Sequence, residues 1–187
     1  EAAVLDGRGV RAVDPSVAPV TTALGVLGMT GFTAYVGVAD IGGVGESDVV
    51  FVSGAAGAVG SVAAQLARAR GARVIGSAGT PEKVAWLDEL GLDGAFDYRM
   101  TETREALREL APDGIDVYFD NVGGETLEAA IGAMRLRGRI VACGSISRYN
   151  ATEALPGPRN LFMVVTKRLR MQGYIISDHA DRFPAFL

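Results

Sequence analysis

The residues best suited to chemistry in this chain are three glycines, Gly54, Gly57 and Gly60, spaced G-x-x-G-x-x-G. They follow an apolar run at 49–52 and precede a small-residue stretch with helical character at 62–67. Because glycine has no Cβ, such a turn lets the backbone approach a pyrophosphate, and the free N–H groups of the helix that follows carry partial positive charge. The spacing is not the strict G-x-G-x-x-G, so the flanking strand and helix carry the prediction of a dinucleotide site. A tight corner without a ligand is the alternative, and a P-loop is excluded because no Gly-Lys-Ser/Thr follows.

The next apolar run ends without an acidic residue, which bears on the choice of dinucleotide. In NAD-binding sheets a carboxylate at the end of the second strand accepts the ribose 2′-hydroxyl, but residues 77–80 read Ser-Ala-Gly-Thr. Thr80 and Pro81 are typical of the N-cap and first position of a helix, which puts Lys83 in the first turn. A lysine is mildly unfavourable there unless an anion binds. The sequence therefore favours NADP(H), with Lys83 on the 2′-phosphate; an exposed bystander is the alternative.

Polar side chains follow three later strands. Tyr98, after the third, is placed to lie along the adenine, with a core aromatic as the alternative. The carboxyl ends of the fourth and fifth strands face the nicotinamide half of a cofactor. Asn121 stands after the fourth strand, suited to a ribose or carboxamide, and Ser145, Ser147 and Tyr149 offer hydroxyls after the fifth.

Composition excludes several classes of protein. The net charge of −4 over 187 residues argues against nucleic acid, and no apolar run is long enough for a membrane helix. The single cysteine, Cys143, is expected to be a small buried hydrophobe, and together with the single histidine, His179, it cannot form an ordinary zinc site. His179 is expected to be solvated. One cysteine and no signal peptide fit a cytoplasmic protein without disulfides.

The elements that must position these residues alternate along the chain. Strands are predicted at 49–52, 73–77, 94–98, 115–120, 139–143 and 171–176, and helices at 62–67, 81–90, 103–110, 125–136, 160–168 and from 180 onward. This alternation predicts an α/β fold, a doubly wound parallel six-stranded Rossmann sheet with helices on both faces.

The first residues differ in pattern. Short β-like pieces at 3–5 and 10–13 are followed by Pro15 and Pro19. Residues 1–26 are therefore expected to be a remnant of another domain's sheet and a linker. Residues 27–187 are expected to form the cofactor domain, entered through a helical stretch at 27–38 and a turn-rich link.

Several motifs together resemble a known family. They are GMTGFTAY at 28–35, AAGAVGS at 55–61, EKV at 82–84, YFDNVGGE at 118–125, and CGSIS at 143–147 followed by Tyr149-Asn150. In order and spacing they resemble the zinc-independent medium-chain dehydrogenase/reductases, in the branch of leukotriene B4 12-hydroxydehydrogenase/15-oxo-prostaglandin 13-reductase and NADP-dependent alkenal double-bond reductases. The resemblance covers nearly the whole chain.

The resemblance implies an NADPH-dependent reductase of the carbon-carbon double bond of α,β-unsaturated ketones or aldehydes. It implies these contacts: Gly57, Ala58, Val59 and Gly60 at the pyrophosphate, Lys83 at the 2′-phosphate, Tyr98 at the adenosine, Asn121 at the middle of the cofactor, Cys143, Gly144, Ser145, Ile146, Ser147 and Tyr149 at the ribose and nicotinamide, and Tyr174 beside the nicotinamide. No metal is implied.

Two departures from the family concern catalysis. Thr166 stands where some members carry a tyrosine that protonates or orients the enolate, so the proton donor stays open between Tyr149, Tyr35 and water. The barrel-like catalytic domain is largely absent, so the chain is expected to be a fragment of a longer enzyme that binds cofactor and turns over poorly or not at all.

The sequence leaves two alternative functions open and also predicts how the chain associates. A quinone oxidoreductase of the same superfamily and a non-catalytic nucleotide-binding or association module are the alternatives. A methyltransferase-like domain is disfavoured by the missing acid after the second strand, and a short-chain dehydrogenase because no tyrosine is followed by lysine four positions on. The sixth strand, 171–176, is an apolar edge, which together with the resemblance predicts a homodimer through that edge.

Overall fold

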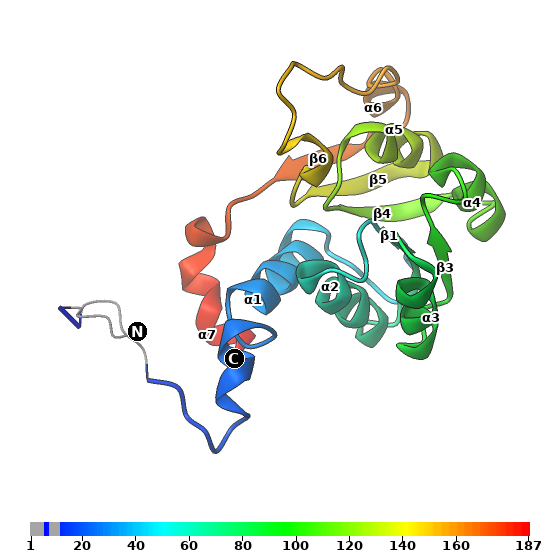
Figure 1. Cartoon of the computed structure of the whole chain (residues 1–187). Coiled ribbons are helices and arrows are strands. Elements are labelled where there is room, and N and C mark those ends of the chain that lie inside the picture. Colours follow the sequence, from blue (N-terminus) through cyan, green and yellow to red (C-terminus); the bar gives the residue numbers. More distant parts are fainter. Residues whose placement is uncertain (1–5, 8–11) are drawn as a thin grey trace.

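The computed structural model describes residues 6–7 and 12–187 (Figure 1). The β-like piece expected at 3–5 and the start of the second piece, at 10–11, lie outside the described residues. Ala12 and Val13 belong to no strand.

A single parallel sheet forms the centre of the molecule (Figure 1). Its strands are β1 (Val49–Val52), β2 (Arg73–Ala78), β3 (Gly94–Asp97), β4 (Ile115–Asp120), β5 (Met134–Ala142) and β6 (Arg170–Gly173), in the order β3-β2-β1-β4-β5-β6. Every neighbouring pair is parallel. This confirms the doubly wound sheet, and it brings all strand carboxyl ends to one edge.

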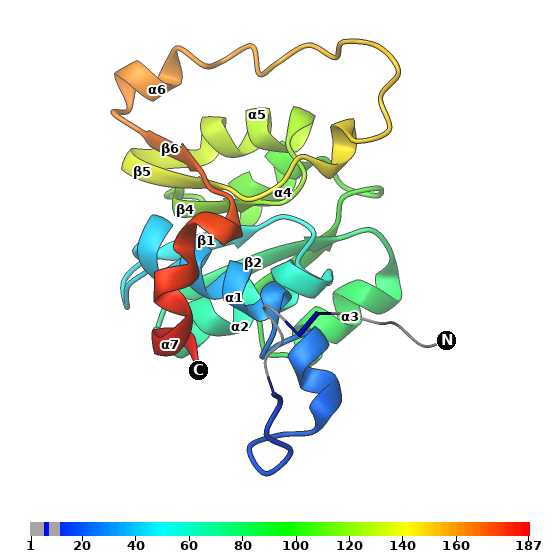
Figure 2. The same ribbon diagram turned by 90° about the vertical axis from the view of Figure 1, so that its left-hand side faces the viewer.

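Helices cover both faces of the sheet, as Figure 2 shows. The α-helices are α1 (Met29–Tyr35), α2 (Ala58–Ala69), α3 (Pro81–Glu89), α4 (Thr103–Leu110), α5 (Gly124–Ala133), α6 (Met163–Thr166) and α7 (Phe183–Phe186), with a π-helix η2 (Val36–Ile41) and 3-10 segments η1 (Val20–Leu24), η3 (Ile146–Arg148) and η4 (Ile176–Arg182). Val52 packs with α1, α2 and α3 on one face, whereas Phe51 packs with α4 and α5 on the other. The alternation of β1 side chains thus divides the core into two layers.

Several boundaries differ from the sequence expectations, among them the start of α2, at Ala58 instead of 62, and the start of the last helix, at Phe183 instead of 180. α5 ends at Ala133, and Met134, expected in the helix, begins β5 in extended conformation, buried and paired with Ile115. α6 has only four residues, where a helix over 160–168 was expected. β6 ends at Gly173, which pairs with Ala142, the last residue of β5, so the chain beyond it has no strand partner. The next residue, Tyr174, donates its hydroxyl to the carbonyl of Thr33 at 2.8 Å.

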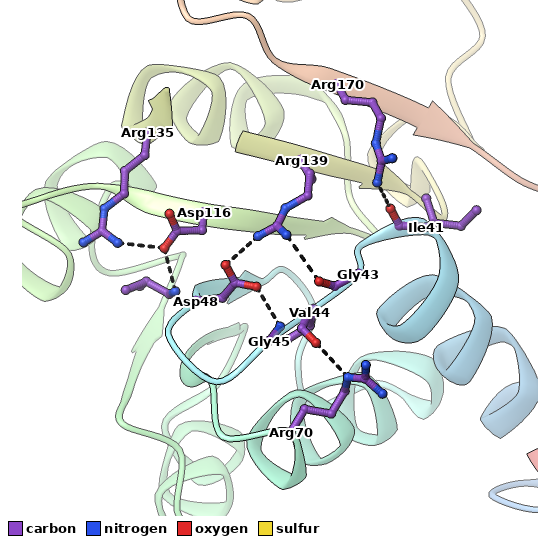
Figure 3. Close-up of polar contacts among 11 residues, drawn as sticks. Ile41, Gly43, Val44, Gly45, Asp48, Arg70, Asp116, Arg135, Arg139 and Arg170 are labelled. Carbon is purple, nitrogen blue, oxygen red and sulfur yellow. Dashed lines mark hydrogen bonds and ion pairs between the residues drawn. The ribbon is translucent and has the colours of Figure 1, made fainter. Parts of the chain in front are cut away.

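Arginines hold the amino-terminal edge of the sheet together (Figure 3). The turn between η2 and β1 exposes carbonyls that accept from three of them: Arg70 Nε donates to Val44 O at 2.7 Å, Arg139 to Gly43 O at 3.3 Å, and Arg170 to Ile41 O. Arg139 also pairs with Asp48 at 2.5 Å. These contacts join β5 and β6 to the segment that leads into β1.

Asp116 completes the same edge at the start of β4. Its Oδ2 accepts from Val49 N at 2.8 Å and pairs with Arg135 at 2.7 Å (Figure 3). The arginines drawn at this edge are thus engaged by carbonyls and carboxylates, and the residues expected to contact a cofactor lie at the opposite, carboxyl edge.

Candidate cofactor site

The glycine turn leads from β1 into α2. Gly54 has a φ of +60°, which favours glycine, and Gly57 is the N-cap of α2. Ser61 N–H donates to Gly57 O at 2.9 Å, so the N–H groups of 58–60 precede the first intrahelical bond and are free to bind an anion. The structure thus brings Gly57, Ala58, Val59 and Gly60 together in the geometry expected of a pyrophosphate site.

Gly60 lies where helix and turn approach most closely. A Cβ on Gly60 would stand 2.3 Å from Gly54 O and 3.0 Å from Ala55 Cα. Both neighbours are backbone atoms, so the approach depends on the absence of a side chain.

The end of β2 carries a cap and a lysine. Thr80 accepts from Lys83 N at 3.3 Å as the N-cap of α3, and the Lys83 side chain is exposed. Tyr98 lies over Gly79. A Cβ added to Gly79 would stand 2.7 Å from the Tyr98 hydroxyl oxygen. Tyr98 is 47% exposed, so it is not a core aromatic. Lys83 and Tyr98 therefore both face solvent next to the end of β2.

Asn121 ties the end of β4 to the end of β1. Its Nδ2 donates to Ser53 O at 2.8 Å and its backbone N–H to Ser53 Oγ at 3.1 Å. The amide nitrogen is thus engaged within the protein, so the side-chain oxygen is the atom suited to a ligand that donates.

A buried polar cluster beneath this contact was missed by the sequence analysis. The Tyr118 hydroxyl donates to Asp120 Oδ1 at 2.7 Å and lies 3.0 Å from Ser53 Oγ. The N–H groups of Val122 and Gly123 donate to the same oxygen, at 2.9 and 2.7 Å. Alternation along β4 places Tyr118 and Asp120 on the same face, a spacing visible in the sequence, but the contact with Ser53 depends on the pairing of β1 with β4.

Burial sets the electrostatics of this cluster. Asp120 is 2% exposed, and burial raises the pKa of its carboxyl group, opposed by the donors from Gly123, Tyr118 and Val122. Burial, followed by the nearby Asp120 charge, raises the pKa of Tyr118 well above its ordinary value. Tyr118 is therefore a hydrogen-bond donor rather than an ionising group.

A cavity of about 590 Å³, wide open to solvent, lies at the carboxyl ends of β5 and β6. Five of the expected contact residues line it: Cys143, Gly144, Ser145, Tyr149 and Tyr174. The other two residues of the expected stretch lie beside it, with Ile146 63% exposed and Ser147 Oγ donating to Val122 O at 2.6 Å. The structure thus brings the predicted nicotinamide-side residues to one place.

Tyr174 forms a wall of this cavity. Its hydroxyl donates to Thr33 O. A Cβ added to Gly37, in the π-helix, would stand 2.6 Å from the hydroxyl oxygen of Tyr174. Burial, then the neighbouring Cys143, raises the pKa of Tyr174. Burial likewise raises the pKa of the Cys143 thiol, which is only partly buried and lines the cavity rather than lying wholly in the core.

The proton-donor candidates lie in different surroundings. Tyr149 is 68% exposed, lines the cavity and accepts from Ser145 N at 3.2 Å. Tyr35 packs against Phe186, with ring centroids 5.7 Å apart, and Thr166 is exposed on α6. Of the two tyrosines, Tyr149 is the one that lines the cavity.

His179 is partly buried. Its ring packs edge-on against the ring of Tyr174, with the two ring centroids 6.0 Å apart. The described part of the chain contains no group of three or more His, Cys, Asp or Glu placed to hold a metal ion. Within the same residues, no helix is both long and apolar enough to cross a membrane.

Comparison with known proteins gives consistent relatives. The sequence is 52% identical over 124 residues to "NADP-dependent oxidoreductase RED1" of Cochliobolus heterostrophus, covering 65% of this chain and 35% of that protein. It is 46% identical over 125 residues to "2-alkenal reductase (NADP(+)-dependent)" of Nicotiana tabacum, covering 66% of this chain and 36% of that protein. The chain therefore spans about a third of the length of these curated relatives.

A solved structure extends the likeness to three dimensions. CurA from Vibrio vulnificus, in complex with NADPH, superposes with a TM-score of 0.84 at 42% identity, over 90% of this chain and 52% of that chain. The resemblance to NADP-dependent reductases drawn from the motifs is thus confirmed.

The zinc-binding dehydrogenase family matches residues 58–187. The zinc of that family's name does not fit this chain, since one cysteine and one histidine, neither in a metal-binding cluster of the described residues, make no ordinary ligand set. Fold, motifs and the matched region nonetheless agree, and the chain belongs to the zinc-binding dehydrogenase family.

Proposed function

We propose that residues 27–187 form the NADP(H)-binding domain of an oxidoreductase that reduces the carbon-carbon double bond of α,β-unsaturated ketones and aldehydes. The observation that carries the proposal is the carboxyl edge of the sheet. It combines the free N–H groups of α2, an exposed lysine at a β2 end without a carboxylate, and a cavity at the ends of β5 and β6. The named activity of the tobacco relative and the NADPH in the CurA complex support the same reading.

Different residues of the chain bind different parts of the cofactor. The N–H groups of 58–60 bind the pyrophosphate, Lys83 pairs with the 2′-phosphate, and Tyr98 lies along the adenosine. Asn121 accepts through its free side-chain oxygen at the middle of the cofactor. When bound, NADPH supplies the hydride that reaches the β-carbon of the substrate.

The nicotinamide half lies against the cavity wall. Residues 143–145 and Tyr174 shape this wall. Tyr149, exposed at the rim, is the tyrosine best placed to give a proton to the α-carbon. The substrate is a small enone or alkenal, and a quinone is the alternative that substrate trials on the longer protein separate.

Residues 1–26 belong in this proposal to the catalytic domain and its linker. Efficient turnover needs a second domain to position the substrate, so the chain by itself binds cofactor with little activity. The single cysteine is consistent with a reducing, cytoplasmic location.

Titration of the chain with NADPH and NADH tests the proposal. We expect saturable NADPH binding, measured by calorimetry, with NADH at least about tenfold weaker because it lacks the 2′-phosphate that Lys83 contacts. Absence of binding to either nucleotide would contradict the proposal, and preference for NADH would contradict the role of Lys83.

A homodimer through β6 is part of the same proposal. β6 is the last strand in the sheet order, and Met171 on it is 39% exposed. An unpaired edge of this kind pairs readily with a second copy. We expect a dimeric mass in light scattering that Met171→Lys converts to monomer. Met100→Lys, at an 81% exposed methionine after β3, is the matched control and should stay dimeric; a monomeric wild type would refute the dimer.

A further inference from the structure

The loop that follows β4 supports the loop that follows β5. Asp120 O accepts from Cys143 N and Gly144 N, both at 2.9 Å, and Asn121 O accepts from Ile146 N at 3.2 Å. Val122 O accepts from Ser147 N at 3.1 Å. Consecutive carbonyls at 120–122 therefore hold 143–147, the stretch whose residues 143–145 line the cavity.

Gly123 brings the two loops into contact. Its φ of +72° lies in the region that favours glycine, and an added Cβ would stand 2.4 Å from Ser145 Oγ. The position of Ser145 therefore depends on the backbone conformation at 122–123.

One side-chain atom fixes that conformation. Asp120 Oδ1 accepts the N–H groups of both Val122 and Gly123, which turns the chain tightly after β4, and the Tyr118 hydroxyl holds the same oxygen from below. A charged acceptor strengthens these bonds, and three donors on one buried oxygen leave it little freedom to move.

The same cluster reaches the start of the glycine turn. Ser53 Oγ lies 3.0 Å from the Tyr118 hydroxyl and accepts from Asn121 N. Ser53 is itself fully buried and immediately precedes Gly54. The carboxylate is thus connected to both halves of the edge. Its backbone donors, Val122 and Gly123, lie on the loop after β4, whereas its side-chain partners are Tyr118 within β4 and Ser53 after β1.

We propose that Asp120 is a positioning residue for the nicotinamide half of the cofactor, holding 121–123 so that the loop 143–147 presents residues 143–145 to the cavity. This inference rests on the proposed NADP(H) function. It assigns Asp120 no contact with the cofactor; Asp120 acts through the two loops, and the adenosine half of the site, at the ends of β2 and β3, does not depend on it.

Two ligands separate the halves of the site. NADPH spans the whole edge, whereas adenosine 2′,5′-bisphosphate has the 2′-phosphate and adenine but no nicotinamide. For Asp120→Asn we expect NADPH affinity to fall by about tenfold, the effect of losing roughly one charge-assisted hydrogen bond's free energy, and adenosine 2′,5′-bisphosphate affinity to stay within about twofold. Calorimetry measures both.

Asp116→Asn is the matched control, since it makes the same change on the same strand at the opposite edge. Its ratio of NADPH to bisphosphate affinity should equal that of the wild type. Tyr118→Phe keeps the ring and deletes one donor, so it should shift the ratio in the same direction by a smaller factor, about threefold, and it tests the inference if Asp120→Asn fails to fold.

Equal weakening of both ligands in the Asp120 and Tyr118 variants would show a general structural role and overturn the inference, as would no weakening of either. Failure of the wild type to bind either ligand is a different result, since it rejects the proposed cofactor itself and the inference with it.

Discussion

Replacing Gly60 with alanine is expected to destabilise the domain by about 1–3 kcal/mol and to weaken NADPH binding by more than about tenfold. A Cβ at this position would stand 2.3 Å from Gly54 O. Because the obstacle is a backbone carbonyl of the turn itself, α2 and the turn must separate. The N–H groups of 58–60 then no longer converge on the pyrophosphate.

Gly132→Ala is the matched control. Gly132 also lies within a helix, but the nearest atom to an added Cβ, Asn160 Nδ2, is 3.9 Å away. Alanine there has space and a better helix propensity, so the free energy of unfolding should rise slightly or stay unchanged. Urea denaturation and NADPH titration of both variants make the comparison.

The two readouts distinguish the physical causes. If Gly60→Ala binds NADPH as tightly as the wild type, the turn does not hold the pyrophosphate and the phosphate site lies elsewhere. If it loses binding with no change in unfolding free energy, the turn adjusts without strain and the close approach at Gly60 is less important for stability than its geometry suggests.

The sheet could be predicted from the sequence because each strand and helix has its own pattern. The apolar run of β1, the Thr-Pro start of α3 and the isolated apolar stretch of β4 are each marked by neighbouring residues. Parallel connections then leave few arrangements. The alternation predicts the doubly wound class of the sheet, and the structure supplies the strand order.

The predicted helix and strand boundaries were wrong where tertiary contacts, and not the local residue pattern, decide where an element ends. The residues at 134–136, Met-Arg-Leu, were expected to continue the helix, and the pairing of Met134 with Ile115 places them in β5 instead. β6 ends where its partner β5 ends, at the pairing of Gly173 with Ala142, and Tyr174 then reaches Thr33 in α1, 141 positions away in sequence. No local signal encodes such a contact.

The residues of the candidate site likewise divide into those that the local sequence predicts and those that depend on tertiary contacts. The glycine turn and Lys83 could be placed from sequence because each depends on one strand-to-helix connection. The cluster of Ser53, Tyr118 and Asp120 could not, because its members become neighbours only when β1 pairs with β4. Cys143 was expected to be a small buried hydrophobe and a cofactor contact; it is partly buried, packs against the core and also lines the cavity.

Lys83→Ala is expected to weaken NADPH binding by about 10- to 100-fold while leaving NADH binding within about twofold. Lys83 is the cation in the first turn of α3, and the preceding β2 end has no carboxylate to repel a phosphate. A charge-assisted hydrogen bond to phosphate contributes about 1–3 kcal/mol, which sets the size of the effect. Nucleotide titration by calorimetry at fixed ionic strength measures it.

Arg108→Ala controls for the loss of a positive charge. Arg108 is exposed near the end of α4, and the helix runs from the carboxyl edge toward the amino edge of the sheet. This variant should keep wild-type affinity for both nucleotides, because Arg108 lies in the last turn of α4, away from the carboxyl edge of the sheet. Equal losses in both arginine and lysine variants would indicate a general charge effect.

NADH separates the remaining possibilities. If Lys83→Ala weakens NADPH and NADH alike, the lysine contacts a part that the two nucleotides share, such as the pyrophosphate. If it weakens neither, Lys83 is an exposed bystander, and any preference for NADPH must come from other donors at the end of β2, where Thr80 and Tyr98 lie nearest. Only a loss confined to NADPH assigns the 2′-phosphate to Lys83, because that phosphate is the sole chemical difference between the two ligands.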